Sequence, residues 1–113
     1  MIKIDLLNEL QQKTKQLEIS LRNLRKAGTE YAQAERDYKI ALRQEALKLR
    51  HEEDMAVTLI QQVVYGVPEV AEKRFLRDVK EAVYKANQEA INTIKLEIRL
   101  IESQLNREWN VKE

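Results

Sequence analysis

The sequence predicts an all-α protein built from two long antiparallel amphipathic helices joined by a short helical elbow. Apolar residues recur at alternating steps of three and four through two long stretches, which is the heptad pattern of a coiled coil. Only two Gly and one Pro occur in 113 residues, so few positions interrupt a helix. Charged residues make up 35% of the chain and aromatic residues 5%, a balance typical of thin helix pairs.

The first long helix is expected over residues 3–53, which would span roughly 75 Å. Gly28 either ends a helix or lies inside one, where it costs about 1 kcal/mol relative to Ala. The heptad phase passes Gly28 without a slip, and this favours one helix with Gly28 as a candidate hinge. The predicted seam comprises Leu7, Leu10, Thr14, Leu17, Leu21, Leu24, Gly28, Tyr31, Glu35, Tyr38, Leu42, Glu45 and Leu49, with Ala27, Ala34 and Ala41 beside it.

The elbow is expected over residues 54–67, where apolar residues are dense and the heptad pattern stops. Thr58 is a candidate N-cap for a short helix, and Gly66 is a candidate for its end. Pro68 suits the first turn of the next helix, and Glu69 suits the positive end of that helix.

The second long helix is expected over residues 68–109, and the short connection implies that it packs antiparallel to the first. Extra four-residue steps near Ala90 predict a local eleven-residue period. Asn87 is either a polar seam residue or an exposed one, and Trp109 is expected to be partly buried. The predicted stripe includes Leu76, Val79, Val83, Ala86, Ala90, Ile94, Ile98, Ile101 and Leu105.

The apolar faces of both helices are wider than one intramolecular seam requires. Ile19, Ile40 and Leu100, for example, lie partly outside the narrow seams. Self-association into a four-helix or larger bundle would bury such residues, so a homo-oligomer is expected.

Composition narrows the functional classes. The chain has no Cys, which excludes disulfides and thiolate chemistry and suits the cytoplasm. The net charge of +1 gives no bulk attraction to nucleic acid, and no segment has the ~20 apolar residues of a membrane span. His51 and Asp54 have metal-ligand spacing, but one histidine beside acids makes no recognised motif. We find no catalytic motif, and therefore expect no enzyme activity, no cofactor and no metal.

Two segments are candidate interaction sites. The elbow concentrates large apolar side chains, some of which must be exposed or covered by a partner protein unless the segment only plugs the end of the bundle. The start of the second long helix carries a basic strip that would contact phosphate in a nucleic-acid-binding alternative, although acids are interleaved with it. The elbow candidates are Leu59, Ile60, Val63, Val64 and Tyr65, and the basic strip comprises Lys73, Arg74, Arg77 and Lys80.

Three stretches carry a family resemblance, namely AERDYKIALRQEALKLR, MAVTLIQQVVYGVPEVAEKRFLRDV and EAVYKANQEAINTIKLEIRLIESQLNREW. Across roughly residues 30–109 the chain resembles small helical proteins of phages and prophages of Gram-positive bacteria. Genes for such proteins often lie near recombination and single-strand DNA-binding genes. The resemblance implies a host-cell cytoplasmic location and assigns no functional residue.

The leading hypothesis is a non-enzymatic phage accessory protein that self-associates and binds a phage or host protein, in phage DNA replication or recombination. One alternative is a nucleic-acid-binding accessory that uses the basic strip. Another is an inhibitor of a host defence or replication enzyme.

Overall fold

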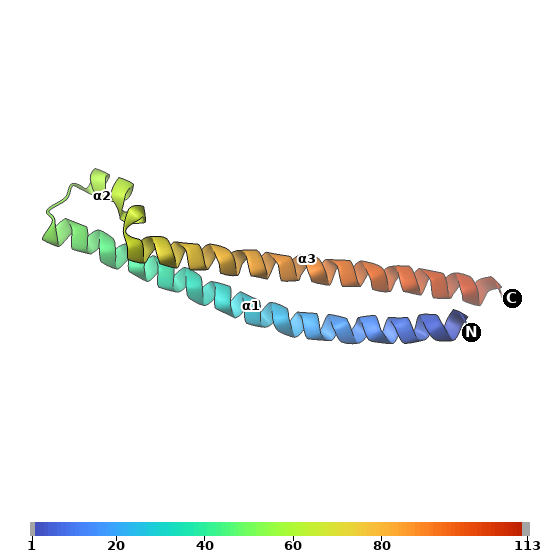
Figure 1. The fold of residues 1–113 in the computed structure, drawn as a ribbon. Helices are drawn as coiled ribbons and strands as arrows, with labels where there is room; N and C mark the ends of the chain where they lie inside the picture. Colours follow the sequence, from blue (N-terminus) through green and yellow to red (C-terminus); the bar gives the residue numbers. More distant parts are fainter. Residues whose placement is uncertain (1, 112–113) are drawn as a thin grey trace. The chain divides into compact units, whose positions relative to one another are not determined.

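The computed structural model describes residues 2–111. Along the chain it has α1 (Ile2–Glu52), α2 (Val57–Val63), a 3-10 turn η1 (Val64–Gly66) and α3 (Pro68–Val111) (Figure 1). The described residues contain no strand, so the all-α prediction is confirmed. No helix in this part of the chain has both the length and the apolar content to cross a membrane.

The long helices begin and end close to where the sequence predicts. α1 runs through Gly28 without interruption, as the unbroken heptad phase indicates. Pro68 is the first residue of α3 and Glu69 lies in its first turn, where a carboxylate favours the positive helix end.

The elbow differs from the prediction in its caps. Thr58 does not cap α2, because it is already the second residue of that helix; the N-cap is Ala56, which makes no side-chain cap bond. Gly66 does not adopt a left-handed conformation and lies instead at the end of η1. The left-handed residue is Asp54, with φ of 47°, just after α1. Asp tolerates this conformation better than most residues, and there it lets the chain leave the helix.

The chain divides into two compact units. The first contains residues 2–26 of α1 and the part of α3 from residue 85 onward, and the second contains residues 27–84. The elbow belongs to the second unit.

In the first unit the two helical segments run antiparallel (Figure 1). Lys13 Nζ lies 2.7 Å from Glu97 Oε2, and Lys3 Nζ lies 3.8 Å from the centre of the Trp109 ring. Trp109 is 63% exposed, so the prediction that it is partly buried in the core is wrong. Its ring lies over a lysine at the open end of the helix pair. The buried side chains of this unit are Leu6, Ile91, Ile94 and Ile101.

The observed seam of α1 differs from the predicted one at every second position. Leu7 is 52% exposed, while Leu6 is buried. Ala27, Ala34 and Ala41 are also buried, so they form the seam itself and do not lie beside it. Leu6 and these alanines share heptad spacing, whereas the predicted seam residues one position later are more exposed. Small seam residues let two helix axes approach more closely than Leu would.

The first half of α3 is turned away from the predicted orientation. Leu76, Val79 and Val83 are exposed, whereas Arg77 and Lys80 are half-buried against α1. Ala86 and Ala90 are exposed as well. Burial along α3 keeps strict three-and-four steps from Val70 to Leu105, so the expected eleven-residue period is wrong.

The polar partners on α1 explain this orientation. Lys80 Nζ lies 3.2 Å from Glu30 Oε2, and Arg77 Nη1 lies 3.6 Å from Glu35 Oε1. Both cations are half-buried beside the alanines, and carboxylates of α1 pair with their charged heads.

We predict that Gly28 matters for close approach and not for flexibility. A Cβ added at Gly28 would lie 3.1 Å from Tyr84 Cε1, and the Tyr84 ring packs 5.9 Å from the Tyr31 ring. In a Tyr84→Ala background, Gly28→Ala should raise the free energy of unfolding by the full helix-propensity gain of about 1 kcal/mol. In the wild-type background the gain should be smaller, because Tyr84 must shift. Urea denaturation of the four chains checks this, and equal gains in both backgrounds would contradict it.

Candidate functional site

The elbow contains both a small core and an exposed surface. Ile60 and Val64 are 7% and 3% exposed and form a buried cluster with Tyr38 and Val70. The residues packed against this cluster are Leu42, Ala46, Leu49, Met55 and Val67. The turn that brings them together is fixed by Arg50, whose Nη1 donates to the Met55 carbonyl at 3.0 Å.

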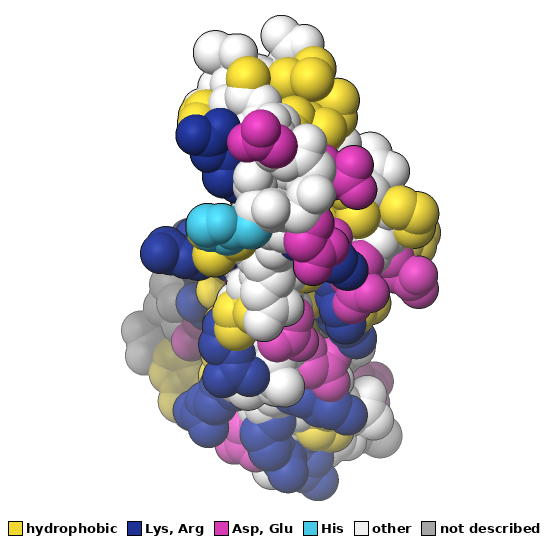
Figure 2. Space-filling view, turned by 90° about the vertical axis from the view of Figure 1, so that its left-hand side faces the viewer, with side chains coloured by type: hydrophobic (Ala, Val, Ile, Leu, Met, Phe, Trp, Pro, Cys, Tyr) yellow, Lys and Arg dark blue, Asp and Glu magenta, His cyan; other side chains and the backbone are white. Residues whose placement is uncertain are grey.

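The other three elbow candidates, Leu59, Val63 and Tyr65, are exposed. The structure therefore separates the five candidates into two core residues and three surface residues. A seven-residue helix has only one side to place against the end of the hairpin; in α2 that side carries Ile60, and Val64 follows it in η1. Figure 2 views this end and shows hydrophobic side chains gathered at the top, where α2 lies, beside acidic and basic ones.

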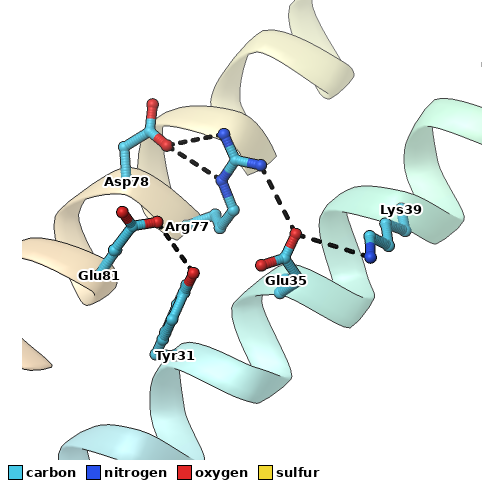
Figure 3. A network of polar contacts seen from close by, with 6 residues as sticks. All are labelled: Tyr31, Glu35, Lys39, Arg77, Asp78 and Glu81. Carbon is cyan, nitrogen blue, oxygen red and sulfur yellow. Dashed lines mark hydrogen bonds and ion pairs between the residues drawn. The ribbon is translucent and has the colours of Figure 1, made fainter.

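The basic strip does not form one outward-facing surface. Arg77 lies in a network that Figure 3 shows: it donates to Asp78 Oδ1 at 2.8 and 3.0 Å and lies beside Glu35. Lys80 is paired with Glu30. The Arg74 guanidinium lies 5.3 Å from the centre of the Tyr65 ring.

The same network holds Tyr31. Its hydroxyl donates to Glu81 Oε2 at 2.9 Å (Figure 3). This hydrogen bond, together with burial and the charges of Glu81 and Glu35, raises the pKa of Tyr31 from 10.0 to about 12. The hydrogen bond to Asp78 raises the pKa of Arg77 above its ordinary value, against an opposing effect of burial. The network therefore links α1 and α3 through a hydrogen bond and an ion pair.

Sequence reasoning missed the outer face of α3 as a surface. Phe75 is 69% exposed, and Leu76, Val79 and Val83 are exposed beside it. Leu76 also borders a groove that runs beside α1 along Gln33 and Asp37. The signal was present in the sequence, because Val70, Arg77 and Tyr84 have heptad spacing in phase with Ile91. That series places Leu76 and Val83 at the flank.

The polar contacts between the helices are ion pairs and a hydrogen bond. In residues 2–111 no three His, Cys, Asp or Glu side chains converge on a point that suits a metal ion, and His51 and Asp54 belong to no such group. Within the same part of the chain, no polar or charged residue is buried.

Asn87 is half-buried in α3, whereas Asn92 is exposed.

No protein-family model, curated protein or solved structure matches the chain.

We predict that Tyr31 makes the stability of the protein pH-dependent in the alkaline range. The folded-state pKa is raised, so the stabilisation is complete below pH 10 and is lost as the pH rises toward about 12. The Tyr31→Phe variant should lack this component. The difference in free energy of unfolding between wild type and variant should therefore shrink between pH 10 and 12, with circular dichroism as the readout. A constant difference across that range would contradict the assignment.

A lysine substitution should destabilise the protein strongly on the buried side of the elbow and hardly at all on its exposed side. Ile60→Lys or Val64→Lys should lower the free energy of unfolding by more than about 3 kcal/mol, because each places a charge in the apolar cluster. Leu59→Lys, one residue away, should change it by less than about 0.5 kcal/mol. Thermal denaturation measures both. If Ile60→Lys were as stable as Leu59→Lys, the elbow core would be wrongly placed.

Proposed function

We propose that the protein acts without catalysis, by associating with itself and with a protein partner through exposed apolar helix faces. The observation that carries this proposal is the number of large apolar side chains left exposed, which exceeds the number that is buried. Four of them form a stripe along α3 in the second unit, namely Phe75, Leu76, Val79 and Val83. Exposed stripes of this kind on a soluble protein are typical of interaction surfaces.

The packing between the helices of the second unit also supports the proposal. Within the second unit alanines, tyrosines and paired charges lie between the helices beside Val70, Leu42 and Leu49, and the aliphatic stripe of α3 lies outside them. Burying one such side chain in an interface contributes about 1.5–3 kcal/mol, so a few of them are enough for stable association.

Leu59, Val63 and Tyr65 make the elbow a second candidate surface for a protein partner. They project from α2 and η1, while Ile60 and Val64 anchor these elements. This surface is rigidly supported, so a partner would lose little affinity to ordering the segment.

The family resemblance adds a biological setting to this proposal: an accessory role in phage DNA replication or recombination inside the host cell. An alternative function for the same partner-binding surfaces is the inhibition of a host defence or replication enzyme.

The nucleic-acid alternative receives less support from the geometry. Arg77 and Lys80 lie beside carboxylates within the seam, so a phosphate would have to displace those partners. We expect no measurable binding of single-stranded DNA at physiological salt in a fluorescence anisotropy titration. Tight binding with a steep salt dependence would favour the alternative instead.

Self-association is testable directly by sedimentation equilibrium. At tens of micromolar the protein should exceed the 13.4 kDa of one chain, because the stripe on α3 is then covered. Phe75→Ser together with Val79→Ser should shift the protein toward the monomer while keeping its helical content, since both side chains are exposed. Wild-type protein that sediments only as a monomer would refute the proposal.

Partner binding at the elbow is tested by affinity capture from the host cell. Leu59→Lys should reduce recovery of the co-purifying protein, whereas Gln61→Lys, at a neighbouring exposed position, should not. Equal recovery with both variants would remove the elbow surface from the proposal.

A further inference from the structure

The second unit carries two surface hollows of opposite charge. One lies along α1 and has the exposed Ile40 among Arg36, Lys39 and Arg43, with Ala32 and Glu35 completing its wall. The other lies at the start of α3 and has Phe75 and Leu76 beside Glu69 and Glu72, with Lys73 also on its wall. Each hollow combines exposed aliphatic or aromatic groups with an excess of one charge.

The charges on the α1 hollow are available for an intermolecular contact. The Arg36 and Lys39 side chains are 66% and 70% exposed, and their ion pairs with Asp37 and Glu35 are long, at 3.8 and 3.9 Å. Glu35 is already engaged by Arg77, so it opposes the basic surface only weakly. Long exposed pairs of this kind contribute little and exchange readily for a better partner.

The two hollows also lie at the same level along the helices. Glu35 is opposite Arg77 and Glu30 is opposite Lys80 in this antiparallel pair. Counting equal numbers of residues along each helix from these pairs places Arg43 level with Glu69 and Ile40 level with Glu72. Rotating a second copy about an axis parallel to the helices preserves these levels. Such a rotation therefore keeps the basic surface of one copy level with the acidic surface of the other.

We propose that a second copy of this chain docks its α1 hollow, around Ile40, on the α3 hollow around Phe75 and Leu76. This inference rests on the proposed self-association and names its surfaces. Arg43 and Lys39 of one copy face Glu69 and Glu72 of the next, and the apolar groups between them leave water together. Because the two surfaces differ, each contact takes the α1 hollow from one copy and the α3 hollow from the other. The occupant is the same chain because one chain carries both halves of the complementary pair.

A charge-swap experiment tests this contact. Lys39→Glu/Arg43→Glu gives an acidic variant, and Glu69→Lys/Glu72→Lys gives a basic variant. All four residues are exposed, so both variants should keep wild-type helical content by circular dichroism. In sedimentation equilibrium the dissociation constant of each variant alone should be at least about tenfold higher than that of wild type, because like charges then face each other.

Mixing the two variants in equal amounts should restore association, since every contact between unlike variants pairs opposite charges. The chain with all four substitutions should also associate by itself. Arg99→Glu/Arg107→Glu is the matched control for the acidic variant, with the same charge change at exposed positions of the first unit, and should behave as wild type.

Undiminished association of both double variants would overturn the proposed contact while leaving self-association intact. Loss of association that neither mixing nor the fourfold swap restores would overturn it as well, since the two hollows would then not face each other. A wild-type chain that stays monomeric would overturn both this contact and the proposed function, and would leave the hollows to a protein of different sequence.

Discussion

The close seam of the second unit is the constraint on which the rest of the structure depends. Ala27, Ala34 and Ala41 are buried where α1 meets α3, and Gly28 leaves room for the Tyr84 ring. Beside the alanines lie tyrosine rings and two half-buried cations, Arg77 and Lys80, whose charged heads pair with carboxylates of α1. The hydrophobic stripe of α3 is consequently displaced to the outside.

This displacement links the internal packing to the proposed role. A hairpin that buried its aliphatic residues internally would have a mostly charged surface. It would then gain little hydrophobic burial from association. Here the polar network of Tyr31, Glu35 and Arg77 connects α1 and α3, while the aliphatic stripe of α3 stays exposed (Figure 3). Specificity within the chain thus comes from charge and small side chains, and affinity between chains would come from hydrophobic burial.

Much of the fold could be predicted from the sequence. Heptad spacing, the scarcity of Gly and Pro, and Pro68 at a helix start are local signals, and each predicted its element correctly. The phase of the seam is not a local signal. Leu6 and Leu7 fit α1 equally well, and α3 carries two overlapping heptad series, one through Val70 and Arg77 and one through Leu76 and Val83. Which series faces inward depends on the residues opposite, and their positions are known only once the helices are paired.

The candidate surfaces were predicted in part for the same reason. Apolar density correctly marked the elbow as a place where core and surface meet, but density alone cannot separate Ile60 from Leu59. That separation follows from which side of a seven-residue helix rests on Tyr38 and Val70. Likewise, the basic strip looked continuous in sequence because Glu30 and Glu35, which hold two of its cations, lie more than forty residues away.

The alanines of α1 are buried while the aliphatic stripe of α3 is exposed. The reactivity of single introduced cysteines is the most direct test of this arrangement, because the chain has no cysteine of its own. Cysteine introduced at Leu76, Val79 or Val83 should react with a thiol reagent nearly as fast as in the unfolded chain when the protein is dilute. It should become protected as the concentration rises and the chains associate. Cysteine introduced at Ala34 should be protected at every concentration. Fast reaction at Ala34 with protection at Leu76 and Val83 in dilute solution would contradict the account.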